Sequence, residues 1–399
     1  MHLRQLFLQH VAQTSDSPLA LEIERGEGMY LYDPSGKAYL DLIAGIGVSS
    51  LGHCHPAVVS ATKQQLDKYL HTIVYGEFVM NPQVQLATLL AEQLPDPLDS
   101  VYFVNSGSEA TEGAMKLAKR YTGRAEIIAC KKAYHGSTQG AASLMHPTAF
   151  TQPFHPLLPG IKHIEFNCEF CLQQITEKTA AVIMETVQAE WGIRKPHSGY
   201  LQKVRKRCDE VGALLILDEI QAGFGRTGTL FAFEQYGIQP DILLLAKGMG
   251  GGMPIGAFVA AREVMQTLSH NPVLGHITTF GGHPVCCAAG LATLQTLLAE
   301  NYIAEVKAKE ALFLELLDHP AILDKRSAGL WMAIELESFD VVRAVIKRCL
   351  EAGLITDWFL FNSHSLRIAP PLIISEEEIR KACGILLEAM DEVTSAVAQ

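Results

Sequence analysis

The sequence predicts an α/β protein with a mostly parallel sheet between helices and a smaller α+β domain built from the chain ends. Between residues 56 and 246, short and fully apolar runs alternate with helical patterns. Strands that are apolar on both sides are typical of a parallel sheet covered on both faces. After residue 300, long helical patterns flank the apolar runs 331–336 and 366–368, which indicates the α+β domain.

The expected elements follow in chain order. Residues 3–11 place apolar side chains on one face of a short helix, and residues 30–41 have the pattern of a hairpin around a Pro-Ser-Gly turn. The expected helices are 56–70, 82–94, 109–121 and 200–211. The expected strands are 101–104, 126–130, 180–184, 213–217 and 242–246. The sequence predicts an N-terminal segment (1–45) that packs with the small domain, a large domain (46–300) and a C-terminal small domain (301–399).

Composition and charge argue against several functional classes. Hydrophobic residues make up 48% of the chain and charged residues 19%, as in an ordinary soluble enzyme. The net charge of −11 offers nucleic acid little attraction, so no nucleic-acid partner is expected. No apolar run reaches the roughly 18 residues that span a bilayer, and the N-terminus lacks the apolar core of a signal peptide. We therefore expect a cytoplasmic protein with no membrane partner.

The cysteines and histidines predict no metal site. Nine cysteines, scattered and odd in number, indicate reduced thiols. Cys168 and Cys171 form a C-x-x-C, but no second pair follows at zinc-ribbon spacing. His53-Cys54-His55 has no further ligands nearby, which favours a loop.

Two apolar runs end at charged residues. Residues 214–217 lead into Asp218, and a buried carboxylate needs a cation or a hydrogen-bond donor beside it. Asp218 is a candidate partner for a protonated pyridine nitrogen, with a helix cap or a metal ligand as alternatives.

Residues 242–246 lead into Lys247 and a glycine-rich turn, and apolar surroundings favour the unprotonated amine that Schiff-base formation needs. A Walker-type phosphate-binding lysine, the alternative, has its glycines before the lysine.

A third strand end predicts an anion site. Residues 101–104 pass through Ser106, Gly107 and Ser108 into a helix. A cofactor phosphate would bind at the positive helix end, to the amides of Gly107 and Ser108 and the serine hydroxyls, with plain N-capping as a compatible alternative.

The segment 223–228 matches G-x-G-x-x-G, but no helix is expected to follow it, which disfavours a dinucleotide site.

Taken together, these segments resemble the class III (ornithine/acetylornithine-type) aminotransferases, which are pyridoxal-phosphate (PLP) enzymes of fold type I. The resemblance covers nearly the whole chain and implies pyridoxal 5'-phosphate as the cofactor, bound by the large domain. The matching blocks are GHCHP at 52–56, NSGSEA at 105–110, AYHGST at 133–138, LILDEIQAGFGRTG at 215–228, LAKGMGGGMPIGA at 245–257 and TFGGHP at 279–284.

The resemblance implies a role for each matching residue. Lys247 corresponds to the lysine that forms the Schiff base and shuttles the proton, and Asp218 to the partner of the pyridine nitrogen. The other cofactor-binding residues are the phosphate-binding Ser106, Gly107 and Ser108, the ring-stacking Tyr134, Gln221 near the ring hydroxyl, and Thr279, which reaches the phosphate of a neighbouring subunit. A homodimer with shared active sites is therefore implied.

Two further matches concern the substrates. Arg367 corresponds to the arginine that binds a substrate carboxylate, and Glu190 to the glutamate that neutralises it when an ω-amine is bound, with an ordinary structural ion pair as the alternative. Ser137 stands where the ornithine and acetylornithine branch has a carboxylate-binding arginine. Strict specificity for those substrates is therefore not expected unless another cation substitutes, the candidates being Lys131, Lys132 and His146.

The sequence thus predicts an aminotransferase that works by a ping-pong mechanism. It would move an amino group between an amine or ω-amino acid (of the ornithine, acetylornithine or 4-aminobutyrate kind) and 2-oxoglutarate or pyruvate. The first alternative is another PLP reaction on the same scaffold, catalysed by an aminomutase, decarboxylase or racemase. A non-catalytic PLP-fold protein and a nicotinamide dehydrogenase that uses residues 223–228 are the other two.

Overall fold

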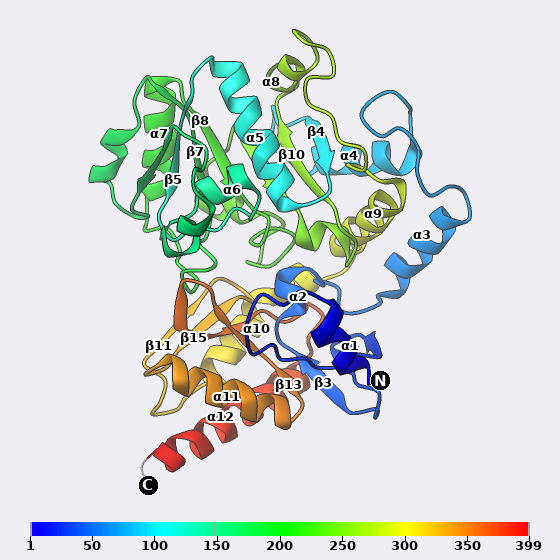
Figure 1. Cartoon of the computed structure of the whole chain (residues 1–399), viewed down its shortest axis with the longest axis vertical. Helices are drawn as coiled ribbons and strands as arrows, with labels where there is room; N and C mark the ends of the chain where they lie inside the picture. Colours follow the sequence, from blue (N-terminus) through cyan, green and yellow to red (C-terminus); the bar gives the residue numbers. More distant parts are fainter. Residues whose placement is uncertain (1, 147, 398–399) are drawn as a thin grey trace.

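A computed structural model describes residues 2–146 and 148–397. Figure 1 shows two lobes: a large lobe built around one broad sheet, and a small lobe in which the N-terminal (blue) and C-terminal (orange to red) segments lie together. The α/β prediction is confirmed. Within the described residues, no helix is both long enough and apolar enough to cross a membrane.

The large lobe is organised by a seven-stranded sheet. Its strands, in spatial order, are β4 (Ser100–Val104), β10 (Gly256–Ala260), β9 (Ile242–Leu245), β8 (Leu214–Asp218), β7 (Thr179–Glu185), β5 (Glu126–Cys130) and β6 (Ile161–Ile164). Only β10 runs antiparallel to its neighbours, so the other six strands point the same way. Their carboxyl ends therefore lie along one edge of the sheet.

Helices cover both faces of this sheet. Along β8, Leu214 and Ile216 pack into one core cluster and Leu215 and Leu217 into another, because successive side chains of a strand point to opposite faces. The helices of this lobe are α3 (Pro56–Leu66), α4 (Asn81–Glu92), α5 (Gly107–Thr122), α6 (Gln139–Ser143), α7 (Tyr200–Val211), α8 (Arg262–Met265) and α9 (Pro284–Ala299). Buried residues of α5 belong to the first cluster, and those of α4, α7 and α9 to the second.

The small lobe joins the two ends of the chain. One sheet contains β1 (Arg25–Glu27), β2 (Tyr30–Tyr32), β3 (Ala38–Asp41) and β13 (Leu354–Ile355), and the other contains β11 (Asp324–Ser327), β12 (Met332–Glu335), β15 (Asn362–Ile368) and β14 (Asp357–Phe359). The hairpin β2–β3 was predicted, and β3 pairs in parallel with β13 through Leu40 and Leu354. The helices are α1 (Leu3–His10), α2 (Ala44–Gly47), α10 (Tyr302–Leu316), α11 (Phe339–Glu351) and α12 (Glu376–Val397). The division at residues 45 and 300 stays a prediction.

The predicted strands lie within one residue of the observed ones, whereas the helix expected over 56–70 ends at Leu66. Strands β6 and β10 were not predicted. Strand β10 returns beside β9 directly after the glycine-rich turn, without an intervening helix, so the alternation of strands and helices gave no signal for it. Helix α1 is present, but its apolar side chains are largely exposed, Leu3 by 65% and Leu8 by 50%.

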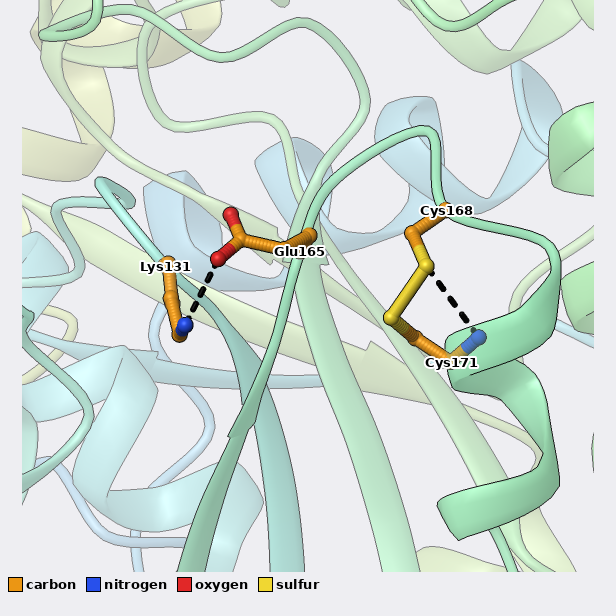
Figure 2. Close-up of a disulfide and its surroundings, with 4 residues drawn as sticks. All are labelled: Lys131, Glu165, Cys168 and Cys171. Carbon is orange, nitrogen blue, oxygen red and sulfur yellow. Dashed lines mark hydrogen bonds and ion pairs between the residues drawn. A yellow bond between two sulfur atoms is a disulfide. The ribbon is translucent and has the colours of Figure 1, made fainter.

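The prediction of reduced cysteines is wrong at one pair. Cys168 and Cys171 form a disulfide, with their Cα atoms 5.3 Å apart (Figure 2). A short 3₁₀ helix, η3 (Phe170–Gln174), folds the chain back after β6, and the Cys171 amide donates to the Cys168 sulfur at 3.2 Å. The other seven cysteines are free thiols, all buried except Cys54. Figure 2 also shows an ion pair of 2.6 Å between Lys131 and Glu165.

Candidate active site

A cavity of about 400 Å³ opens where the carboxyl ends of the parallel strands meet. Strands β4, β7, β8 and β9 contribute residues at or just after their carboxyl ends, and the segment after β5 contributes Tyr134 and His135, as expected for an α/β sheet. The lining contains most of the predicted cofactor-binding residues, namely Ser106, Gly107, Ser108, Tyr134, Asp218, Gln221 and Lys247. Among the described lining residues, Lys247 is the only lysine and no arginine is present.

Asp218 ends β8 in a nearly closed environment, with 4% of its surface exposed. Its Oδ1 accepts a hydrogen bond of 2.9 Å from the Ile220 amide, and its Oδ2 lies 2.7 Å from Nδ1 of His135. The side chain of His135 is buried, and its Nε2 has no hydrogen-bond partner among the described residues. The sequence predicted Asp218 but missed His135, although this histidine lies inside the matching block 133–138.

Glu185 stands beside Asp218 as its register partner on β7. It accepts hydrogen bonds from the amides of Tyr134 (3.1 Å) and Ala189 (2.9 Å). Burial raises the pKa of Glu185 well above its ordinary value, and the neighbouring charge of Asp218 raises it further. A protonated Glu185 leaves Asp218 as the negative charge of this pair.

Lys247 follows β9 in a backbone conformation that is uncommon for a side chain of this size. Its φ is 45°, in the left-handed region, and such strain is retained where the surrounding structure holds it in place. The next residue, Gly248, is closely packed, since a Cβ there would lie 3.0 Å from the Ser50 hydroxyl and 3.1 Å from Cβ of Phe224. Burial lowers the pKa of Lys247 from its ordinary value, while the charge of Glu190 opposes this shift. The site therefore favours an unprotonated amine.

The start of α5 forms a set of free donors at the opposite side of the cavity. Ser106 is the N-cap, and its hydroxyl accepts from the Glu109 amide at 3.2 Å. The first-turn amides of Gly107 and Ser108 have no acceptor inside the helix. A Cβ at position 107 would lie 2.8 Å from Cδ1 of Ile220, so any larger residue there would require the Ile220 side chain to move. These donors and the helix dipole suit a phosphate group.

Tyr134, Gln221 and Trp331 complete the walls of the cavity. The hydroxyl of Tyr134 lies 2.9 Å from that of Ser137, and the Ser137 amide donates to the Ser108 hydroxyl at 3.2 Å. Ser137 is exposed and does not line the cavity. Trp331 is buried and was missed, because a lone tryptophan in an apolar run gives no signal beyond core packing.

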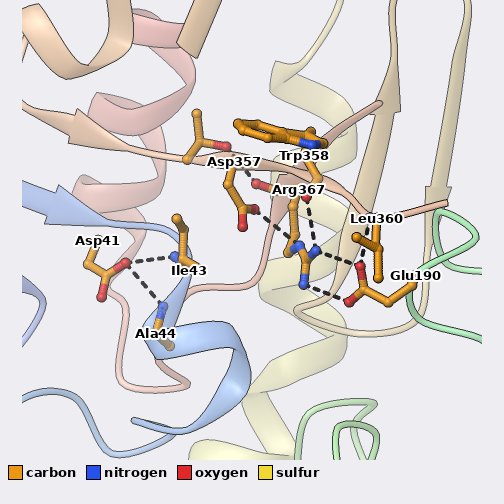
Figure 3. A network of polar contacts seen from close by, with 9 residues as sticks. Asp41, Ile43, Ala44, Glu190, Asp357, Trp358, Leu360 and Arg367 are labelled. Carbon is orange, nitrogen blue, oxygen red and sulfur yellow. Dashed lines mark hydrogen bonds and ion pairs between the residues drawn. The ribbon is translucent and has the colours of Figure 1, made fainter. Parts of the chain in front are cut away.

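Glu190 and Arg367 form the predicted ion pair. Their side chains meet in two hydrogen bonds, of 3.1 and 2.9 Å, and the Leu360 amide donates to Glu190 at 2.9 Å (Figure 3). Both residues are buried, and neither lines the cavity. Figure 3 shows a second carboxylate beside the arginine, Asp357, with 3.1 Å between its Oδ1 and Nε of Arg367. No sequence pattern had indicated this residue.

The remaining candidates lie elsewhere. Thr279 is exposed and does not line the cavity of its own chain. The residues proposed to replace the arginine that is absent at position 137 do not line the cavity either. Lys131 pairs with Glu165, and Lys132 lies 4.3 Å over the ring of Trp191. His146 is outside the lining as well. Residues 223–228 form successive turns rather than the start of a helix, so they do not make a dinucleotide site.

Comparisons with known proteins agree with this geometry. The family model described as Aminotransferase class-III matches residues 11–390. The chain is 41% identical to the acetylornithine aminotransferase of Methanopyrus kandleri over 370 residues, covering 92% of this chain and 93% of the relative. It is 42% identical to the putrescine aminotransferase of Pectobacterium atrosepticum over 380 residues, covering 90% of this chain and 80% of the relative.

Two solved structures are similar over almost the entire chain. The ornithine aminotransferase from Toxoplasma gondii superimposes with a TM-score of 0.92 at 30% identity, over 99% of this chain and 95% of that one. The omega transaminase from Pseudomonas jessenii in complex with PMP gives a TM-score of 0.92 at 28% identity, over 100% of this chain and 99% of that one.

Proposed function

The chain belongs to the class-III aminotransferase family, and we propose that it moves an amino group from an amine or ω-amino acid to a 2-oxo acid in two half-reactions at one site. Its cofactor is pyridoxal phosphate. One observation carries the proposal: Lys247, Asp218 and the first turn of α5 meet at a single cavity. Three distant segments thus supply an amine, a buried carboxylate and an anion site within one space.

The residues present fit the cofactor. The free amides of Gly107 and Ser108 match its phosphate, with Ser106 beside them, and the Ile220 side chain packs closely against position 107. The buried pair of Asp218 and His135 presents a negative charge far from solvent, which suits a protonated ring nitrogen. Tyr134 is proposed to stack on the ring face and Gln221 to lie near the ring hydroxyl.

When bound, pyridoxal phosphate supplies an aldehyde that takes up amino groups and a ring that accepts electron density from the reacting carbon. Lys247 is proposed to carry the proton to and from that carbon through its Nζ, because burial keeps the amine unprotonated below the usual lysine pKa. Asp218 is proposed to hold the proton on the ring nitrogen. Its orientation is fixed by His135 and by the Ile220 amide, so it needs no rearrangement during the reaction.

Glu190 and Arg367 are proposed to select substrates by charge. The guanidinium offers a two-pronged donor that suits a substrate carboxylate, and Glu190 occupies this donor when the bound amine has no carboxylate. The described lining contains no arginine, and Ser137 is not part of it. These features favour donors whose distal end is uncharged or apolar, and they leave both 2-oxoglutarate and pyruvate as acceptors.

We also propose a homodimer in which Thr279 of one subunit reaches the phosphate bound by the other. The exposure of Thr279 and its position away from its own cavity support this arrangement. A cytoplasmic location, with no nucleic-acid or membrane partner, remains our prediction from the composition.

The test uses the colour of the holoprotein. A donor amine should bleach the cofactor absorbance, and addition of pyruvate or 2-oxoglutarate should restore it. One molecule of amino acid should form for each molecule of donor amine consumed. An aminomutase, decarboxylase or racemase would give no net exchange of amino groups between two substrates. Borohydride reduction followed by peptide mapping should label Lys247, and a label at any other lysine would contradict the assignment.

A further inference from the structure

Arg367 has a second acidic neighbour on the adjacent strand. Asp357 of β14 is the register partner of Arg367 on β15, so the two side chains leave the sheet side by side. The distance from Asp357 Oδ1 to Arg367 Nε is 3.1 Å, and the side chains of the two residues are exposed by 25% and 3%. Neither atom completes a hydrogen bond with good geometry among the described residues, so this is a contact between charges.

The two carboxylates occupy different sides of the guanidinium (Figure 3). Glu190 holds both terminal nitrogens, which form the edge that a substrate carboxylate would need. Asp357 lies at Nε, the Trp358 carbonyl accepts from a terminal nitrogen at 3.0 Å, and the Phe359 ring centroid lies 4.6 Å from the guanidinium carbon. Glu190 can therefore leave without disturbing the contact with Asp357.

We propose that Asp357 is a positioning residue that sets the charge selectivity of the active site. It steadies Arg367 from the Nε side, and its negative charge weakens the attraction of this arginine for a substrate carboxylate. Amines without a carboxylate do not experience this penalty. The proposal deepens the proposed function, since it rests on Arg367 being the carboxylate-binding residue.

The charge balance around Arg367 supports this role. One guanidinium already faces two carboxylates, Glu190 and Asp357. A substrate carboxylate that displaces Glu190 brings a third anion into a largely buried space, where charges repel more strongly than in water. A neutral amine or a diamine brings no anion, so Asp357 discriminates between the two kinds of substrate.

Asp357 is also placed to titrate near neutral pH. Burial raises its pKa to about 6, Arg367 acts in the opposite direction, and the charges of Glu190 and Asp41 raise it further. Asp41 lies on β3, where it is buried and its Oδ2 lies 2.8 Å from Nε2 of His53. As the pH falls through about 6, Asp357 loses its charge, and carboxylate substrates should bind more tightly.

The experiment compares the wild-type holoenzyme with Asp357→Asn in separate half-reactions, followed through the cofactor absorbance. The amide keeps the shape of the side chain and removes its charge. At pH 8 the KM for 2-oxoglutarate should fall about three- to tenfold, since a like charge has been removed from beside the binding arginine. The KM and kcat for a monoamine such as benzylamine should change less than about twofold.

Two further measurements separate charge from structure. In the wild-type enzyme, the KM for 2-oxoglutarate should fall between pH 7.5 and 5.5, and Asp357→Asn should abolish this fall. The KM of the variant at each pH accounts for the titration of other groups such as Lys247, because these groups are common to both proteins. Asp357→Glu should restore the pH dependence. As a matched control, Asp324→Asn removes a carboxylate that pairs with Arg326 on the same sheet and should alter neither KM.

An unchanged or higher KM for 2-oxoglutarate in Asp357→Asn, with normal monoamine turnover, would overturn the proposal while leaving the aminotransferase function intact. A wild-type KM for 2-oxoglutarate that does not fall between pH 7.5 and 5.5 would overturn it too, even if the variant failed to fold. Failure of every amine to bleach the cofactor would instead count against the proposed function itself.

Discussion

The cofactor cavity and the cluster around Arg367 are assembled in different ways. The cavity collects residues that directly follow parallel strands, so Asp218 and Lys247 reach it because their strands end at the same edge. The Arg367 cluster instead combines a loop after β7 with neighbouring positions of two antiparallel strands, β14 and β15. This difference agrees with our proposal that the large sheet fixes the reaction, whereas the choice of substrate depends on where the loop after β7 meets strands β14 and β15 of the small lobe.

If the cavity alone carries the chemistry, Lys247→Ala should have the largest effect. Turnover should fall by about 10⁴-fold or more with every substrate, because the variant lacks both the amine and the proton carrier. Steady-state rates with two donors of different charge would measure this. The melting temperature of the apoprotein serves as the control, and it should change little, since burial disfavours the charged form of the replaced lysine. Comparable activity in the variant would show that the chemistry resides elsewhere.

A change in the Arg367 cluster should affect substrates that carry a carboxylate and leave other substrates nearly unaffected. In Arg367→Lys the two-pronged donor is lost while the charge remains, so the KM for a 2-oxo acid should rise about 10- to 100-fold, roughly 1.4 to 2.8 kcal/mol. The half-reaction of an amine without a carboxylate should be nearly unaffected. Half-reaction titrations would measure both values. Equal losses with both substrates would mean that the two regions are not separable.

The pKa of Lys247 offers a test of the cavity by itself. A lysine with a lowered pKa is unprotonated at lower pH than usual, so capture of pyridoxal phosphate by the apoprotein should speed up with rising pH and level off below pH 10.5. Below this break the rate should rise about tenfold per pH unit. Absorbance during reconstitution would locate the break. A break at or above the ordinary lysine value would show that burial does not activate the amine.

The smallest effect is expected outside both regions, at the disulfide. Cys168 and Cys171 are separated by three positions, and closing so short a loop stabilises a fold by about 2 kcal/mol at most. Reduction, or the double change Cys168→Ser with Cys171→Ser, should lower the melting temperature by only a few degrees (about 2 to 4 °C). Half-reaction kinetics should not change. A loss of activity on reduction would connect this loop to the site.

The two regions also differ in how well they could be predicted. The strand ends, Asp218, Lys247 and the phosphate-binding start of α5 were predictable, because an apolar run that stops at a charge or a small polar residue is a local signal. Asp357, His135 and Trp331 were not assigned to the site, since each depends on which distant segment lies beside it. The contact of Asp357 with Arg367 needs the register of β14 against β15, which no local pattern contains. The disulfide was missed because a C-x-x-C does not reveal whether the chain turns between its cysteines.

The parallel pairing of β3 with β13 has a consequence for biosynthesis. Leu40 emerges from the ribosome more than three hundred residues before its partner Leu354. The Leu42 carbonyl, which accepts a hydrogen bond of 2.7 Å from the Ala369 amide in the folded protein, is separated from that partner by a still longer stretch of chain. The nascent chain must therefore carry β1–β3 with the β3 edge unpaired until residues 354–369 have been synthesised. Premature termination would leave that edge open, which makes truncated products natural clients for chaperones and proteases.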